Sequence, residues 1–222
     1  MHKMGLVLCS VLILFPLGAA GNREADTGEP EDAKVSAVVS FLQGEATING
    51  QTAEEGESVP IGARIETGSN SFVEITFGRQ NIFRVEAETI TTVSIGQTDR
   101  RIQIEKGSID AVFERLGMIT NNDQFRVETP SVVAGIRGTV FYIKVEQPDT
   151  TYLCTCHGTV HQQASDGTVE KDITAYHHKA YRYIKTDTGI HIETGSLIYH
   201  DDQSMQRLGE KIGVKIPWGR AE

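Results

Sequence analysis

Residues 72–77 read Phe-Val-Glu-Ile-Thr-Phe, so that apolar side chains at 73, 75 and 77 alternate with a set that contains Glu74 and Thr76. This two-residue period is that of a β-strand with one dry face and one wet face. Short runs of the same kind, rich in Val, Ile, Phe and Thr and separated by Gly, Asn or acidic residues, recur at 35–42, 45–48, 82–85, 88–95, 102–105, 108–113, 124–128 and 140–145. No long helical pattern precedes residue 200. We therefore predict an all-β fold whose strands pack in layers.

The composition is that of an ordinary globular protein. The chain has 222 residues, of which 39% are hydrophobic and 23% charged, enough for one domain or two small ones. Its net charge of -9 argues against nucleic acid as a partner, because phosphate binding needs a surplus of basic side chains. Three cysteines are too few for a disulfide framework.

The first twenty residues have the order of a secretory signal peptide. Met1 to Lys3 is basic, residues 4–17 are apolar apart from one serine, and Gly18-Ala19-Ala20 provides small residues for cleavage. We expect a periplasmic or otherwise exported protein, with an uncleaved N-terminal anchor in the inner membrane as the alternative. Residues 21–34 carry four acidic side chains after Glu24 and no apolar period, and we interpret them as an acidic tether.

Residues 127–141, Val-Glu-Thr-Pro-Ser-Val-Val-Ala-Gly-Ile-Arg-Gly-Thr-Val-Phe, resemble the signature of the FecR domain family. Residues 55–68 resemble the opening block of that family and residues 103–109 its middle block, in the family's order, so that the resemblance covers about residues 35–162. It implies an elongated antiparallel sandwich or a solenoid-like stack of short strands. It also implies a stand-alone exported FecR-domain protein, a β module that binds a protein or cell-envelope ligand and takes part in signalling. FecR itself couples an outer-membrane iron-siderophore transporter to a sigma factor through a cytoplasmic domain. This chain shows no such domain, so we do not carry sigma-factor regulation over.

The signature also predicts a structural loop. Pro130 biases the preceding residue toward an extended conformation, and two glycines allow a close turn around Arg137. We expect the Arg137 guanidinium to be buried and to bond loop carbonyls or a carboxylate, with an anion or partner contact as the alternative. The loop residues are Thr129, Pro130, Gly135, Arg137, Gly138 and Thr139.

The C-terminal extension, residues 163–222, continues an unusual concentration of metal-ligating side chains. Six of the seven histidines and two of the three cysteines lie between residues 154 and 200. In a regular strand Cys154 and Cys156 project to the same face, with Cα atoms about 6.6 Å apart. Two thiolates with two imidazoles suit a transition metal such as zinc, although the spacing matches no established finger. The candidate metal ligands are Cys154, Cys156, His177, His178, His200 and Asp202.

Two other interpretations of the cysteines stay open. They could form a strained or redox-active pair, because an exported compartment favours thiol oxidation, or they could be buried thiols that only pack. Motifs for a serine nucleophile, a zinc protease or a nucleotide-binding loop are absent from the sequence, so we expect a non-enzymatic protein. A catalytic cysteine would need a lowered pKa and an accessible sulfur, whereas a structural one would be sealed from solvent.

The last part of the chain contains the one predicted helix, near residues 203–212. Asp201 or Asp202 can cap it and Gly213 can end it. The adjacent histidines 177 and 178 should fall on opposite faces of a strand over 174–184, and Trp218 should fold back onto the strands as an anchor.

Overall fold

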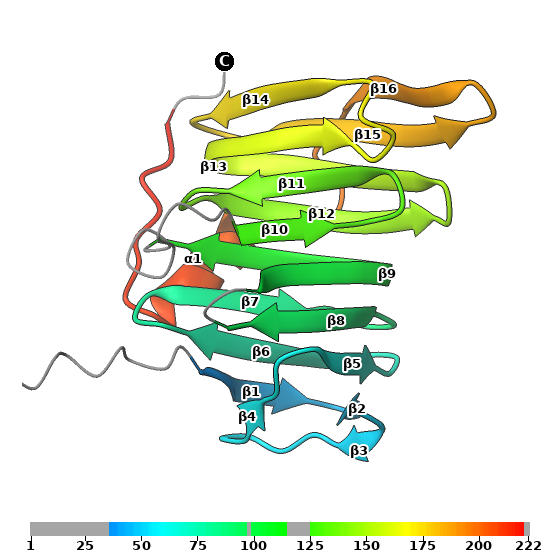
Figure 1. Cartoon of the computed structure of the whole chain (residues 1–222). Helices are drawn as coiled ribbons and strands as arrows, with labels where there is room; N and C mark the ends of the chain where they lie inside the picture. Colours follow the sequence, from blue (N-terminus) through cyan, green and yellow to red (C-terminus); the bar gives the residue numbers. More distant parts are fainter. Residues whose placement is uncertain (1–35, 97–98, 115–124, 220–222) are drawn as a thin grey trace, which may run out of the picture. The chain divides into compact units, whose positions relative to one another are not determined.

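The computed structural model describes residues 36–96, 99–114 and 125–219 (Figure 1). The predicted signal peptide and acidic tether lie outside these residues. Within them the chain forms sixteen strands and one helix: β1 (Ala37–Gln43), β2 (Ala46–Ile48), β3 (Gln51–Thr52), β4 (Ser58–Val59), β5 (Ala63–Thr67), β6 (Phe72–Phe77), β7 (Asn81–Val85), β8 (Ile90–Ile95), β9 (Arg100–Phe113), β10 (Phe125–Glu128), β11 (Val132–Ile136), β12 (Val140–Gln147), β13 (Thr150–Ala164), β14 (Glu170–Ala175), β15 (Lys179–Thr186), β16 (Gly189–Gly195) and α1 (Asp202–Glu210).

The strands form two sheets that share their two longest members. Sheet A has the order β16-β15-β13-β12-β9-β7-β6-β1-β4. Sheet B has the order β14-β13-β11-β10-β9-β8-β5-β2-β3. Because β9 and β13 belong to both sheets, the pairs β9-β12-β13-β11-β10-β9 close a ring of five strands, a small barrel with further strands on each side.

Glycines allow the two shared strands to pass from one sheet to the other. Strand β9 pairs in sheet B up to Lys106 and in sheet A from Gly107, whose φ is +90°. Strand β13 pairs in sheet A up to His157 and in sheet B from Gly158, whose φ is +99°. Only glycine adopts this backbone conformation without steric cost, so these two positions fix where the ring bends.

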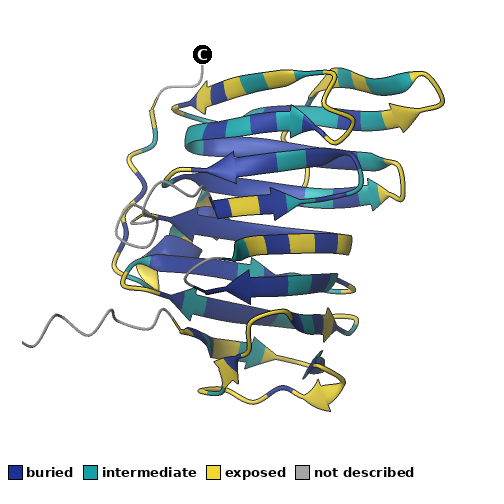
Figure 2. Cartoon of the chain, viewed as in Figure 1, coloured by how far each residue is buried: buried dark blue, intermediate teal, exposed yellow. Residues whose placement is uncertain are grey.

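Figure 2 shows the buried positions along the strands. The hydrophobic side chains at buried positions form two clusters, because successive side chains of a strand point to opposite faces. The larger fills the interior and includes Phe77, Phe113 and Leu153. The second lies on the other face of sheet A, where Tyr142, Tyr152, Cys154 and Cys156 pack with residues of α1 and the chain that follows it. We call this the outer face of sheet A.

The prediction of a mostly β fold with one short C-terminal helix is confirmed. The sandwich or solenoid-like stack is not plainly what forms, because the five-strand ring is closed and its β9–β10 pair is parallel. The runs predicted at 102–105 and 108–113 are one strand bent at Gly107, and residues 132–136, expected within a loop, form β11.

Helix α1 begins as its sequence predicts. The Asp201 carboxylate accepts a hydrogen bond from the Ser204 amide at 2.7 Å, and the Ser204 hydroxyl lies 3.1 Å from the Asp201 amide, which completes a capping box. The helix has nine residues, and among the described residues no helix has the length and apolar character needed to span a membrane.

Candidate metal centre

A β-bulge in β13 places the two cysteines. Val140 of β12 pairs with His157 and Phe141 pairs with Thr155, so Cys156 between them has no partner on β12. Bulges re-aim side chains locally, and this one lies where β13 is about to bend at Gly158. Both cysteines are free thiols on the outer face of sheet A, and each is 0% exposed. The predicted shared face is confirmed, although the strand is irregular where flat geometry was assumed.

Two histidines reach the cysteines from later parts of the chain. His178 lies in the turn between β14 and β15 with φ +35°, and its amide donates a hydrogen bond to the Cys156 carbonyl at 3.0 Å. The expectation that histidines 177 and 178 lie within one strand and point to its opposite faces is wrong, since both lie in this turn. His200 stands between β16 and α1, just ahead of the capping aspartate, and its ring stacks on Tyr142 with centroids 4.6 Å apart.

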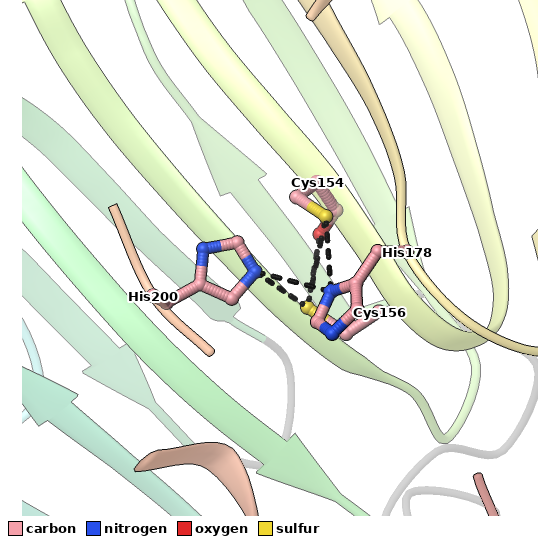
Figure 3. A group of neighbouring side chains, drawn as sticks. All are labelled: Cys154, Cys156, His178 and His200. Atoms are coloured by element: carbon pink, nitrogen blue, oxygen red, sulfur yellow. Dashed lines mark hydrogen bonds between the residues drawn. The ribbon is translucent and has the colours of Figure 1, made fainter. Parts of the chain in front are cut away.

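The four side chains converge on one point (Figure 3). The two sulfurs are 3.8 Å apart, and the two facing ring nitrogens, His178 Nδ1 and His200 Nε2, are 3.3 Å apart. Cys154 Sγ lies 3.6 Å from His178 Nδ1, and Cys156 Sγ lies 3.2 Å from His200 Nε2. All four ligand atoms lie within 4.8 Å of one another, so a single ion could contact all of them.

Asp202 orients His178 from behind. Its Oδ1 accepts a hydrogen bond from His178 Nε2 at 2.7 Å, which leaves the Nδ1 lone pair directed at the sulfurs. His177 Nε2 lies 3.0 and 3.1 Å from the two oxygens of the same carboxylate. Carboxylates in this position fix the tautomer and orientation of metal-ligating histidines. Asp202 and His177, both predicted as ligands, are therefore not among the four converging atoms, and with His178 they form a second cluster of possible metal ligands.

The contacts split the acidities of the two thiols. The hydrogen bond from the Cys156 thiol, aided by His178 and His200, lowers the pKa of Cys154 to about 4 against the effect of burial. Burial, with the neighbouring Cys154 charge, raises the pKa of Cys156 well above its usual value. Burial alone would lower the pKa of His178, but its bonds to Cys154 and Asp202 outweigh that effect and raise it. These contacts thus favour the thiolate form of Cys154, which is the form that binds cations.

Most of the predicted signature loop is structural. Thr129 closes the β10–β11 turn, since its hydroxyl donates to the Val132 carbonyl at 3.0 Å and accepts from the Val132 amide at 3.1 Å. Pro130 lies in the same turn, and its carbonyl accepts from the Ser165 hydroxyl at 2.8 Å. Gly138, with φ +77°, turns the chain from β11 into β12.

Two expectations about the loop are corrected. Gly135 lies inside β11 opposite His161 and has no turn to make. Arg137 is exposed, so it is not the buried guanidinium that the surrounding small residues suggested. Thr139 is buried, and its methyl group packs against Gly158. A Cβ atom added at position 158 would lie 2.6 Å from that methyl group, so the contact leaves room for glycine only. The loop therefore supports the bend that follows the two cysteines.

The model of the family described as FecR protein matches residues 63–161. These residues form a FecR domain. The FecR domain runs from the start of β5 into β13 and includes both cysteines, whereas His178 and His200 lie beyond it. Two crystal structures of a candidate anti-sigma factor from Parabacteroides distasonis, at 1.65 and 2.50 Å resolution, are similar at 13% identity, with a TM-score of 0.48 over 60% of each chain. No curated protein matches the chain.

The sequence alone did not distinguish the four converging side chains from the residues that orient them. The cysteine pair and the histidine-rich tail were visible, but the bulge at Cys156 and the outer position of Asp202 were not. Trp218, predicted as an anchor, stacks on His178 with centroids 5.3 Å apart and an interplanar angle of 23°. Its position after a proline was the available signal for that contact.

Proposed function

We propose that this FecR-domain chain binds one transition-metal ion, zinc, through Cys154, Cys156, His178 and His200. Zn–S bonds of about 2.3 Å and Zn–N bonds of about 2.0–2.1 Å in a tetrahedron put ligand atoms about 3.8 Å apart for two sulfurs, about 3.5 Å for sulfur and nitrogen, and about 3.3–3.4 Å for two nitrogens. Of the six separations here, one between sulfurs is 3.8 Å, two between sulfur and nitrogen are 3.6 and 3.2 Å, and the one between nitrogens is 3.3 Å, while the other two lie within 4.8 Å. That agreement is the observation on which the proposal depends.

The second cluster fits a hydrogen-bonded support better than a second ion. A metal held by His177, His178 and Asp202 would separate its nitrogen and oxygen ligands by about 3.3 Å. The observed separations are 2.7 to 3.1 Å, the range of ordinary hydrogen bonds. One ion per chain is therefore expected.

Burial favours a structural metal over a thiol nucleophile. The lowered pKa of Cys154 would suit a reactive thiolate, but both cysteines are 0% exposed. Four protein ligands also fill a tetrahedral ion, as in structural zinc sites, and leave no position for a substrate. Thiol redox chemistry is accordingly the weaker use of this pair.

Metal analysis of the purified chain, combined with a thiol titration, tests this function. We expect one zinc per chain and two cysteines that react with a thiol reagent only after chelation or unfolding. The double variant Cys154→Ser/Cys156→Ser should lose the ion, whereas His191→Ala, which alters an exposed histidine outside the site, should keep it. A wild-type chain that takes up no metal and whose stability is unchanged by zinc or by chelator would refute the proposal.

We further propose that the chain is an exported, non-enzymatic module that serves in signalling or regulation by binding a protein or cell-envelope ligand. The FecR domain supports the signalling role. Strand β16 ends the order of sheet A and has no buried residue, and the adjacent chain exposes Leu197, Ile198 and Tyr199. Exposed strand edges beside apolar side chains suit strand or loop recognition.

A photo-crosslinking residue tests this contact in cells. Placed at Ile198, which is 53% exposed, it should give a defined adduct. The same residue at Asp187, exposed in the β15–β16 turn, should not give that adduct. Identical adduct patterns from the two positions would contradict recognition at this edge.

A further inference from the structure

The C-terminal segment, residues 196–219, covers the outer face of sheet A. Among the described residues it contains α1 and no strand, so it is held to the sheet mainly by side-chain contacts and not by strand pairing. Met205, Leu208, Val214 and Ile216 are all buried in the second hydrophobic cluster. The Lys211 ammonium lies 2.5 Å from the buried Glu74 carboxylate of β6.

Both ends of the C-terminal segment meet at the metal centre. His200, near its start, supplies one of the four ligand atoms. Trp218, near its end, stacks on the His178 ring and lies edge-on to His177, with centroids 5.8 Å apart. A bound ion would therefore join the FecR-domain cysteines to the beginning of this segment and fix the histidine on which its end is packed.

Without an ion the same groups make a weaker junction. Each ligand atom must then be satisfied by a hydrogen bond from a neighbour, and the sulfur atoms that take part in these contacts are weak donors and weak acceptors. His200 Nδ1 is buried without a hydrogen-bond partner among the described residues. His178 is held at φ +35°, a conformation that costs energy for a residue with a Cβ. These features indicate a site shaped for a ligand that draws all four side chains together.

We propose that metal occupancy controls the docking of the C-terminal segment, so that the protein converts the availability of zinc into exposure of the outer face of sheet A. The inference rests on the proposed function, because it requires that zinc binds at the four ligands. Loss of zinc uncovers the apolar face that includes Tyr142 and Tyr152. Rebinding of zinc covers it again.

The chain contains one tryptophan, which makes a direct test available. Zinc-loaded and chelator-treated protein are compared by Trp218 emission, by acrylamide quenching and by amide hydrogen exchange. Metal removal should shift the emission to longer wavelength, increase quenching and accelerate exchange in α1 about tenfold or more, while exchange in β8, which lies in sheet B, stays unchanged. Zinc added back should restore all three signals at the concentration that fills the site.

Variants separate the segment from the site. His200→Ala removes the ligand that lies in the segment and should give the chelated signals even with zinc present. His191→Ala, outside the cluster, should respond to zinc like the wild type. If zinc binds at one ion per chain but Trp218 emission and α1 exchange stay the same on its removal, the docking inference is overturned and the proposed metal function stands.

Two further outcomes would each overturn the docking inference. If no zinc binds at all, the proposed function fails and the docking inference fails with it. If chelation accelerates exchange in β8 as much as in α1, the metal stabilises the whole described fold. That result would overturn a device specific to the C-terminal segment.

Discussion

Replacing Asp202 with asparagine should weaken zinc binding without removing a ligand. The Asp202 carboxylate accepts a hydrogen bond from His178 Nε2 at 2.7 Å. A hydrogen bond to a charged group contributes about 1.5–3 kcal/mol and one between neutral groups about 0.5–1.5 kcal/mol. The Asp202 side chain is 46% exposed, so solvent screening favours the small end of that difference. A loss of about 1–1.4 kcal/mol corresponds to a five- to tenfold weaker affinity, roughly the lower end known for such supporting carboxylates.

The affinity is measured by competition with a chromophoric zinc chelator at neutral pH. Cobalt substitution adds a second readout, because thiolate-to-cobalt absorption reports the ligand set directly. In Asp202→Asn the cobalt spectrum should stay that of two sulfurs and two nitrogens while the zinc affinity falls. Asp187→Asn, at an exposed turn, is the matched control and should change neither.

Two results would refute the reasoning. An affinity within twofold of the wild type would mean that the Asp202 charge does not support His178. A changed cobalt spectrum would mean that Asp202 is itself a ligand, contrary to the 2.7 Å hydrogen-bond separation.

Three further predictions concern the fold. Gly213→Ala should lower the free energy of unfolding by about 1–2 kcal/mol, the cost of a left-handed backbone at a position with open space around it. Gly107→Ala should lower it by well over that amount, because a Cβ at 107 would lie 2.5 Å from the Thr89 backbone. Urea denaturation compares the two variants, and equal losses would contradict the role of Gly107. Glu74→Ala should cost about 3 kcal/mol in the same assay, because it removes the buried carboxylate that lies 2.7 Å from Arg84 and 2.5 Å from Lys211 and leaves Arg84 with Glu86 at 3.6 Å. A loss below about 1 kcal/mol would argue against a strong interaction. Burial raises the pKa of Asp110 well above its ordinary value of 3.8, so folding takes up a proton above that pH. The free energy of unfolding should therefore fall as the pH rises toward the raised pKa. Asp110→Asn should flatten this decline, and an unaltered pH profile of unfolding in the variant would contradict the role of Asp110.

The strands were predictable because alternation is a local property. Residues 72–77 form β6, as their two-residue period indicated, and residues 140–145, a run rich in Val, Ile and Phe, lie within β12. The helix was equally local, since the Asp201 cap and Ser204 are three residues apart. Closure of the five-strand ring was not predictable in this way. It depends on which strands meet across the barrel, and the bends at Gly107 and Gly158 decide that only when partner strands are present.

The sequence by itself determined the types of chemistry available. It placed two thiols two residues apart on one face and collected six histidines downstream of them. The tertiary structure decided which of these residues act together. His200 is 44 residues from Cys156, and their 3.2 Å separation arises because the C-terminal segment packs on the outer face of sheet A. The type of each side chain is a property of its own position in the sequence. A tetrahedral set of ligands also requires particular distances between side chains, and these depend on packing between segments that are remote in the chain. No period in the sequence encodes such distances.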